Sequence, residues 1–113
     1  MDNCVFCMIR DGVIPSKIVY EDELIMAFND INPQAPVHIL VTPKEHIDSL
    51  DLITSDNSYL ISHIFEKIPT IASEAGLVNG YRVVSNCGSD GCQSVSHVHF
   101  HILGGAKLLN RMA

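Results

Sequence analysis

The stretch SHVHFHILGG (residues 96–105) decides how this chain folds. In it, His97, His99 and His101 alternate with apolar side chains. Because successive side chains of a β-strand point to opposite faces, the alternation predicts a strand over residues 97–103 with one apolar face and one face of imidazoles. Imidazole is the side chain best suited to proton transfer, nucleophilic attack or metal binding near neutral pH, so this face indicates a site.

The rise of a strand limits what the three histidines can do together. Neighbouring histidines of the run lie about 6.6 Å apart along the strand, and the outer two about 13 Å. One metal ion can take two neighbours but not all three, so the imidazoles must divide their roles. A metalloenzyme with an open zinc site on His97 and His99 is one interpretation, although no third ligand stands in the same motif.

The remaining sequence predicts an α+β fold with an antiparallel sheet. A short helical turn is expected over residues 4–10, a β-hairpin over residues 17–20 and 24–28, and further strands over residues 37–42 and 81–86. A long helix is expected over residues 55–75, where apolar side chains follow helical spacing, with Thr54 or Ser55 capping its start and Gly76 its end.

Composition restricts the class of protein. The chain has 113 residues, 47% of them hydrophobic, and is expected to form a single domain over residues 1–113. A net charge of −6 argues against a nucleic acid polymer as partner. No apolar run reaches transmembrane length and residues 1–4 lack the features of a signal peptide, so we expect a cytoplasmic protein with no membrane association. The four cysteines are then thiols or metal ligands rather than disulfides.

The histidine run and its surroundings resemble the histidine triad (HIT) family. His-φ-His-φ-His-φ-φ, with φ apolar, is similar to the family signature. Residues 28–47 (FNDINPQAPVHILVTPKEHI), 80–86 (GYRVVSN) and 88–95 (GSDGCQSV) resemble both halves of its Hint branch. The resemblance covers nearly the whole chain. It implies a five-stranded antiparallel sheet with one long and one or two short helices, joined across a homodimer into a ten-stranded sheet.

The resemblance also implies an activity: hydrolysis of purine nucleoside phosphoramidates, such as AMP or GMP joined to an amine, at the α-phosphorus. His99 matches the family's nucleophile, which forms a nucleotidyl-histidine intermediate. His101 matches a donor to phosphate oxygens, and Ser94 a hydroxyl at the leaving group. A dinucleoside polyphosphate hydrolase and a low-turnover nucleotide-binding or scaffold protein are the alternatives. The best-known Hint proteins end in a tryptophan-containing tail, and residues 107–113 contain no Trp, so substrate preference is not carried over.

Further residues match the family's nucleotide-binding positions. Asp30 matches a carboxylate that accepts from the ribose hydroxyls, and Asn86 and Gln93 match neutral donors to the phosphoryl oxygens. His38 lies near the triad in the family, with no role assigned. Arg and Lys are scarce around these segments, which suits one phosphoryl centre better than a long polyphosphate. The apolar slot for the purine is matched by Phe6, Ile9, Phe28, Ile31 and Leu40.

A CxxC pair near the start of the chain indicates a metal site. Bacterial-type members of the family bind one structural zinc per chain through such a pair and two histidines, here Cys4, Cys7, His46 and His97. A four-cysteine site that uses Cys87 and Cys92 instead is a rival, and a redox CxxC is a third reading. In the family pattern Cys87 and Cys92 have no role, which favours free thiols.

A homodimer is expected from the residues as well as from the resemblance. The predicted helix carries a wide apolar stripe that includes Ile61, Ile64, Ile68 and Ile71. A small domain buries a limited share of its surface, and an open sheet edge invites pairing. The resemblance implies a two-fold dimer that joins the long helices and the edge strands, here the strand over residues 81–86.

Overall fold

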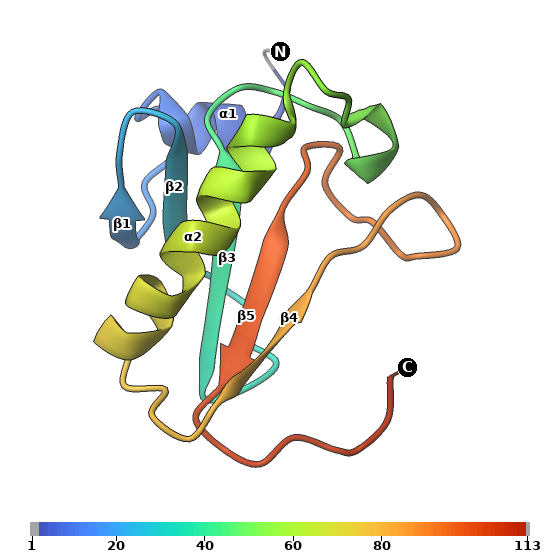
Figure 1. Cartoon of the computed structure of the whole chain (residues 1–113). Coiled ribbons are helices and arrows are strands. Elements are labelled where there is room, and N and C mark those ends of the chain that lie inside the picture. The colour runs from blue at the N-terminus through green and yellow to red at the C-terminus, as the bar shows by residue number, and fades with distance from the viewer. Residues whose placement is uncertain (1–2, 113) are drawn as a thin grey trace.

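Five antiparallel strands form one sheet, in the order β1-β2-β3-β5-β4, in the computed structural model, which describes residues 3–112. This confirms the predicted fold class, with one long helix and short helices beside an antiparallel sheet (Figure 1). The elements in chain order are α1 (Val5–Arg10), β1 (Ile18–Glu21), β2 (Ile25–Asn29), β3 (Val37–Pro43), the 3-10 helix η1 (Leu50–Leu52), α2 (Ser58–Glu74), β4 (Tyr81–Val84) and β5 (Phe100–Gly104).

Helix α2 crosses one face of the sheet, as Figure 1 shows, and buries the main core beneath it. Alternate residues of the central strands face this helix, so that Ile39 of β3 pairs with Ile102 of β5 in the core. Three isoleucines of the stripe that favoured a dimer, Ile64, Ile68 and Ile71, are 3% exposed or less because they pack on the sheet of the same chain. That stripe is therefore no independent evidence for a homodimer.

The other face of the sheet carries a smaller apolar cluster and most of the histidines. Phe6 of α1 packs there with Met26, Phe28 and Leu40 of the strands. Because side chains alternate along a strand, His101 stands on this face, opposite Leu40 of β3 in the register. The catalytic candidates therefore lie between α1 and the sheet.

The predicted start of the long helix is wrong by three residues. The helix begins at Ser58, and neither Thr54 nor Ser55 caps it. The side chain of Asn57 accepts from the Thr54 N–H at 2.7 Å, and the Ser58 N–H donates to the Thr54 carbonyl at 2.9 Å, so these residues close a turn ahead of the helix. The expected end is close, because α2 stops at Glu74 and Gly76 follows with a φ of +81°.

The strand of histidines also begins later than predicted, at Phe100 rather than His97. The Val98 N–H donates to the Ile47 carbonyl at 2.6 Å, and the Val98 carbonyl accepts from the Thr42 hydroxyl at 2.8 Å. The backbone just before β5 therefore makes hydrogen bonds outside the sheet. His97 is then not held to the sheet face that His99 and His101 share.

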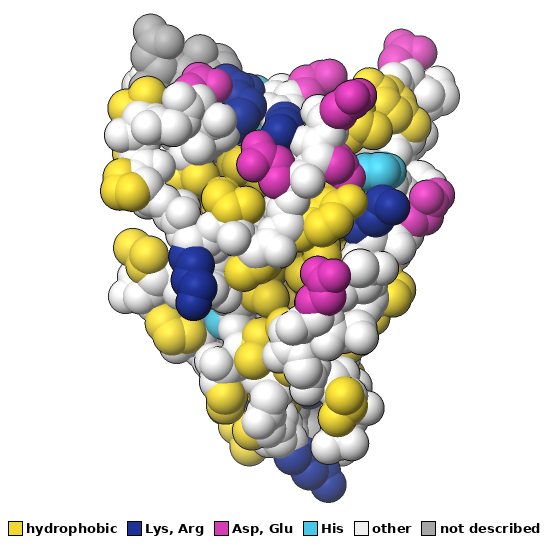
Figure 2. Space-filling view, turned by 90° about the vertical axis from the view of Figure 1, so that its left-hand side faces the viewer, with side chains coloured by type: hydrophobic (Ala, Val, Ile, Leu, Met, Phe, Trp, Pro, Cys, Tyr) yellow, Lys and Arg dark blue, Asp and Glu magenta, His cyan; other side chains and the backbone are white. Residues whose placement is uncertain are grey.

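Two further features concern membranes and nucleic acids: the apolarity of the helices and the distribution of charged side chains. Among residues 3–112, no helix is both long enough and apolar enough to cross a membrane. Figure 2 shows the side of the molecule where β1 and the C-terminal end of α2 lie, and there basic side chains are interspersed with acidic ones. On that face no basic patch gathers of the kind that binds a nucleic acid backbone.

Candidate functional site

His99 is held as a neutral imidazole with one nitrogen left for chemistry. Its Nδ1–H donates to the His97 carbonyl at 2.7 Å, which leaves the lone pair on Nε2. The residue is 3% exposed. Burial lowers the pKa of His99, although the bond to the carbonyl and the Asp30 charge oppose the shift. At neutral pH the ring is therefore unprotonated at Nε2, as a nucleophile requires.

A chain of hydrogen bonds fixes the proton of His101. The Gln34 backbone N–H donates to His38 Nδ1 at 3.0 Å, so the proton of a neutral His38 sits on Nε2. That nitrogen lies 2.8 Å from His101 Nδ1, which must accept, and His101 therefore carries its own proton on Nε2. Burial lowers the pKa of His101 to about 4, and the imidazoles of His99 and His38 add to the shift. His101 thus offers an N–H donor while staying neutral.

His99 and His101 line a cavity of about 300 Å³ beside α1, whereas His38 lines a different hollow. The same cavity is lined by Asp30, Ser94, His99 and His101, so it joins a carboxylate and a hydroxyl to the two imidazoles. No Lys or Arg belongs to its lining among the described residues. Its walls include all five residues expected at the purine slot, Phe6, Ile9, Phe28, Ile31 and Leu40.

Asn86 and Gln93 make bonds within the protein rather than lining that cavity. The Asn86 side-chain amide donates to the Gly91 carbonyl at 2.6 Å. The Gln93 Nε2 donates to the carbonyls of Asp48 at 2.6 Å and Val95 at 2.9 Å. Both amide hydrogens of Gln93 are thus engaged, and the residue fixes the loop that carries Ser94. Donation by Asn86 and Gln93 to a phosphoryl group remains a prediction.

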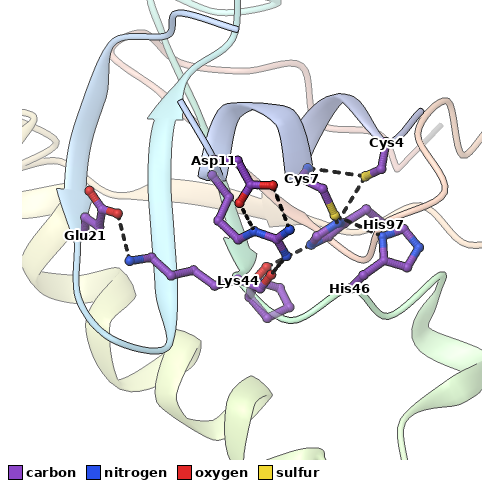
Figure 3. Close-up of polar contacts among 9 residues, drawn as sticks. Cys4, Cys7, Asp11, Glu21, Lys44, His46 and His97 are labelled. Carbon is purple, nitrogen blue, oxygen red and sulfur yellow. Dashed lines mark hydrogen bonds and ion pairs between the residues drawn. The ribbon is translucent and has the colours of Figure 1, made fainter. Parts of the chain in front are cut away.

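A second group of side chains can hold a metal ion: Cys4, Cys7, His46 and His97. Cys4 Sγ lies 3.3 Å from His97 Nδ1, and Cys7 Sγ lies 3.4 Å from His46 Nδ1 and 3.6 Å from His97 Nδ1 (Figure 3). Sulfur and nitrogen ligands of one tetrahedral zinc ion, at about 2.3 and 2.0 Å from the metal, stand about 3.5 Å apart. The observed spacings fit that geometry.

The outer nitrogens of both histidines support the same conclusion. His46 Nε2 lies 2.6 Å from Asp48 Oδ1, and His97 Nε2 lies 2.8 Å from the Pro43 carbonyl. Both acceptors require a proton on Nε2, so each Nδ1 turns a lone pair toward the two sulfurs, as metal-binding histidines do. Burial lowers the pKa of His97 to about 4, which keeps it in the neutral form that a metal needs.

The composition of this cluster distinguishes between the alternative metal sites that the cysteines and histidines could form. Cys87 and Cys92 lie outside the cluster, which disfavours the four-cysteine set. His97 faces Cys4 and Cys7, whereas His99 gives its Nδ1 to a carbonyl, so the two do not form an open metal site together. The first histidine of the run thus serves the cluster.

The sequence did not point to Asp48, and it gave His38 a place near the triad but no role. Asp48 is the hydrogen-bond acceptor of His46, and its place two residues further on was the only local signal. His38 stands 63 residues from its partner His101, and only the pairing of β3 with β5 brings them together. Asp30 lies near this pair as well, with Oδ2 3.5 Å from His38 Nε2.

Comparisons with known proteins agree with this geometry. The family model described as "Scavenger mRNA decapping enzyme C-term binding" matches residues 3–112. Protein HitA of Neisseria gonorrhoeae is 44% identical over 104 residues, which cover 92% of this chain and 97% of that protein. A solved HIT family hydrolase from Clostridium thermocellum superposes with a TM-score of 0.97 at 41% identity, covering 100% of this chain and 99% of the other. A histidine triad protein from Clostridium difficile gives 0.93 at 54% identity, with coverage of 99% and 97%.

Proposed function

This chain belongs to the histidine triad (HIT) family, and on that premise we propose that it hydrolyses purine nucleoside phosphoramidates of the AMP-amine type. The solved relatives from Clostridium thermocellum and Legionella pneumophila are named hydrolases, which supports the general class of reaction. The side chains that line the cavity support cleavage at a single phosphoryl group, as in a phosphoramidate. Their neutral donors suit one phosphoryl centre of modest charge, whereas a polyphosphate calls for Arg, Lys or Mg²⁺.

The observation that carries the proposal is the state of His99. A buried neutral imidazole, bound at Nδ1 and open at Nε2, lines the same cavity as a wall of apolar side chains and a carboxylate. The apolar walls suit a purine, and the Asp30 carboxylate suits the ribose hydroxyls. A nucleotide bound in this way brings its α-phosphorus to the imidazoles.

Catalysis then runs in two substitutions at phosphorus. The His99 Nε2 lone pair attacks the α-phosphorus, the P–N bond to the amine breaks, and the Ser94 hydroxyl relays a proton to the departing amine. The His101 N–H donates to the phosphoryl oxygens, whose charge grows during attack. Water then attacks the nucleotidyl-histidine, its proton replaces the one that Ser94 gave to the amine, the phosphorus–nitrogen bond to His99 breaks, and the nucleoside monophosphate leaves.

In this proposal one structural zinc per chain would be held by four side chains, those of Cys4, Cys7, His46 and His97. Bound there, zinc supplies a fixed tetrahedral crosslink and no reactive position. The crosslink ties α1, which contributes Phe6 to the cavity, to the segment just before β5. The Arg10 guanidinium donates to the Lys44 carbonyl at 2.7 Å and holds the same helix from its other end.

We further propose a homodimer in the cytoplasm. β4 is an edge strand of the sheet, and Tyr81 at its start is 40% exposed. Two copies paired along β4 would give the ten-stranded sheet. Unpaired edges associate readily, so this pairing removes a liability of the single chain.

The test of the reaction is His99→Ala with an AMP-amine substrate. This variant should lose nearly all turnover yet bind AMP, and His99→Gly should regain part of it when imidazole is added. Rapid quenching of the wild type should trap one nucleotidyl group on the protein through a phosphorus–nitrogen bond. His63→Gln, which changes a histidine outside the cavity, is the matched control and should turn over normally.

Other outcomes separate the alternatives. Near-normal turnover by His99→Ala would refute the covalent mechanism. Preference for dinucleoside polyphosphates over AMP-amines would favour the polyphosphate hydrolase. Tight AMP binding with no turnover of either substrate would favour a binding protein.

A further inference from the structure

A second hollow opens beyond Ser94. Its volume is about 620 Å³, and Asn3, His46, Asp48 and Ser96 contribute to its lining. Val5, Ser94 and Val95 line this hollow and the nucleoside cavity alike. The two spaces therefore meet at the residues that flank Ser94.

The reaction proposed above needs such a space. In a displacement at phosphorus the attacking and leaving atoms stand roughly in line, so the amine departs on the side away from His99. The nucleoside fills the apolar cavity, and the amine must extend outside it. The hollow that shares Ser94 with that cavity adjoins the hydroxyl proposed to protonate the amine.

The charge of the hollow indicates which amines it accepts. Among the described residues of its lining, Asp48 alone carries a carboxylate, and neither hollow nor cavity is lined by Lys or Arg. Asp48 is 57% exposed at its side chain, and Oδ1 accepts from His46. A carboxylate with no Lys or Arg beside it among the described lining residues gives this space a negative charge.

From this arrangement we propose that the hollow is the leaving-group subsite, and that Asp48 selects aliphatic amines carrying a second, positively charged nitrogen. The proposal rests on the function proposed above. Among the described lining residues there is no aromatic side chain other than His46, so stacking of an aromatic amine finds little surface there. Asn3, Ser94 and Ser96 offer hydrogen bonds to a polar amine instead.

The experiment compares two substrates of equal length: AMP joined through one nitrogen to 1,4-diaminobutane, and AMP joined to butylamine. Binding is measured by calorimetry on His99→Ala, which needs no turnover, and kcat/KM is measured on the wild type. For an exposed charge pair we expect a preference of about two- to fivefold for the diamine conjugate, falling as salt is added.

The variants isolate the charge of Asp48. Asp48→Asn keeps an oxygen that accepts from His46 and should bring the preference close to one. Ser96→Lys places an opposite charge in the hollow and should reverse it. Asp51→Asn, on η1 and outside the lining, is the control and should keep the wild-type preference. Zinc content is measured for each variant, so that loss of the metal is not mistaken for loss of selection.

The outcomes are distinct. Equal affinity of the two conjugates for the protein, or an unchanged preference in Ser96→Lys, would overturn the subsite. If the wild type hydrolysed neither conjugate, the proposed function would fail, while the calorimetric preference would still decide the subsite.

Discussion

Replacing His38 tests whether this residue positions the proton of His101. His38→Leu keeps an apolar side chain of similar size but removes the donor that lies 2.8 Å from His101 Nδ1. His38 is 5% exposed, so water does not readily replace the lost donor, and a buried acceptor left unpaired costs about 1–3 kcal/mol. Without that donor nothing selects the tautomer of His101 that carries its proton on Nε2, so donation from Nε2 to the phosphoryl oxygens is weakened.

The loss should appear in the transition state, where charge grows on the phosphoryl oxygens. Since each 1.36 kcal/mol is worth tenfold in rate, kcat/KM for an AMP-amine should fall roughly 10- to 100-fold, mostly through kcat. His38→Gln carries an amide N–H near the position of Nε2 and should recover much of the activity. The Gln34 N–H, which loses its partner in the Leu variant, is at an exposed position where water can replace it.

The assay is steady-state hydrolysis, with AMP affinity, zinc content and thermal unfolding measured on the same samples. A structural defect would lower stability and would not be relieved by Gln in particular. Wild-type kcat/KM in His38→Leu, or equal losses in the Leu and Gln variants, would refute the positioning role.

Three other predictions concern the metal, the assembly and the hydrogen-bonded carboxylate of Asp22, which lies outside the site. Purified protein should contain one zinc per chain, and Cys4→Ser/Cys7→Ser should abolish binding and lower the melting temperature; a metal-free wild type would contradict this. Light scattering should give a mass near twice 12.4 kDa, and Tyr81→Asp at the exposed start of the edge strand β4 should lower both mass and nucleotide affinity; a fully active monomer would exclude the dimer. Burial tends to raise the pKa of Asp22, but hydrogen bonds from His63 and two backbone amides lower it below 3.8. The ionised Asp22 carboxylate therefore stabilises the folded chain above pH 3.8, and this stabilisation is lost as the pH falls and the carboxylate becomes protonated. Asp22→Asn should lower the free energy of unfolding in urea by about 1–3 kcal/mol at pH 7 and by much less near pH 2. An equal difference at both pH values would refute this dependence on the ionisation of Asp22.

Local pattern was enough to predict the elements and the residue types of the site. Alternation over residues 97–103 and helical spacing around Ile64 depend only on neighbours in the chain, and a strand and a helix form that overlap the predicted ranges. Errors arose at element ends. At Thr54 and Asn57 a side chain competes with the helix for a backbone N–H, and at Val98 the backbone binds a segment some fifty residues away, at Ile47. Periodicity carries no information about either bond.

The sequence by itself determined that an antiparallel sheet would present imidazoles on one face, because the side-chain period of a strand is a local property. Only the tertiary structure decided how those imidazoles divide their roles. His97 turns to Cys4 and Cys7, some ninety residues away, and His101 accepts from His38 on the adjacent strand. Hydrogen bonds act over about 3 Å, so partners distant in the chain meet only after the strand order and register are set.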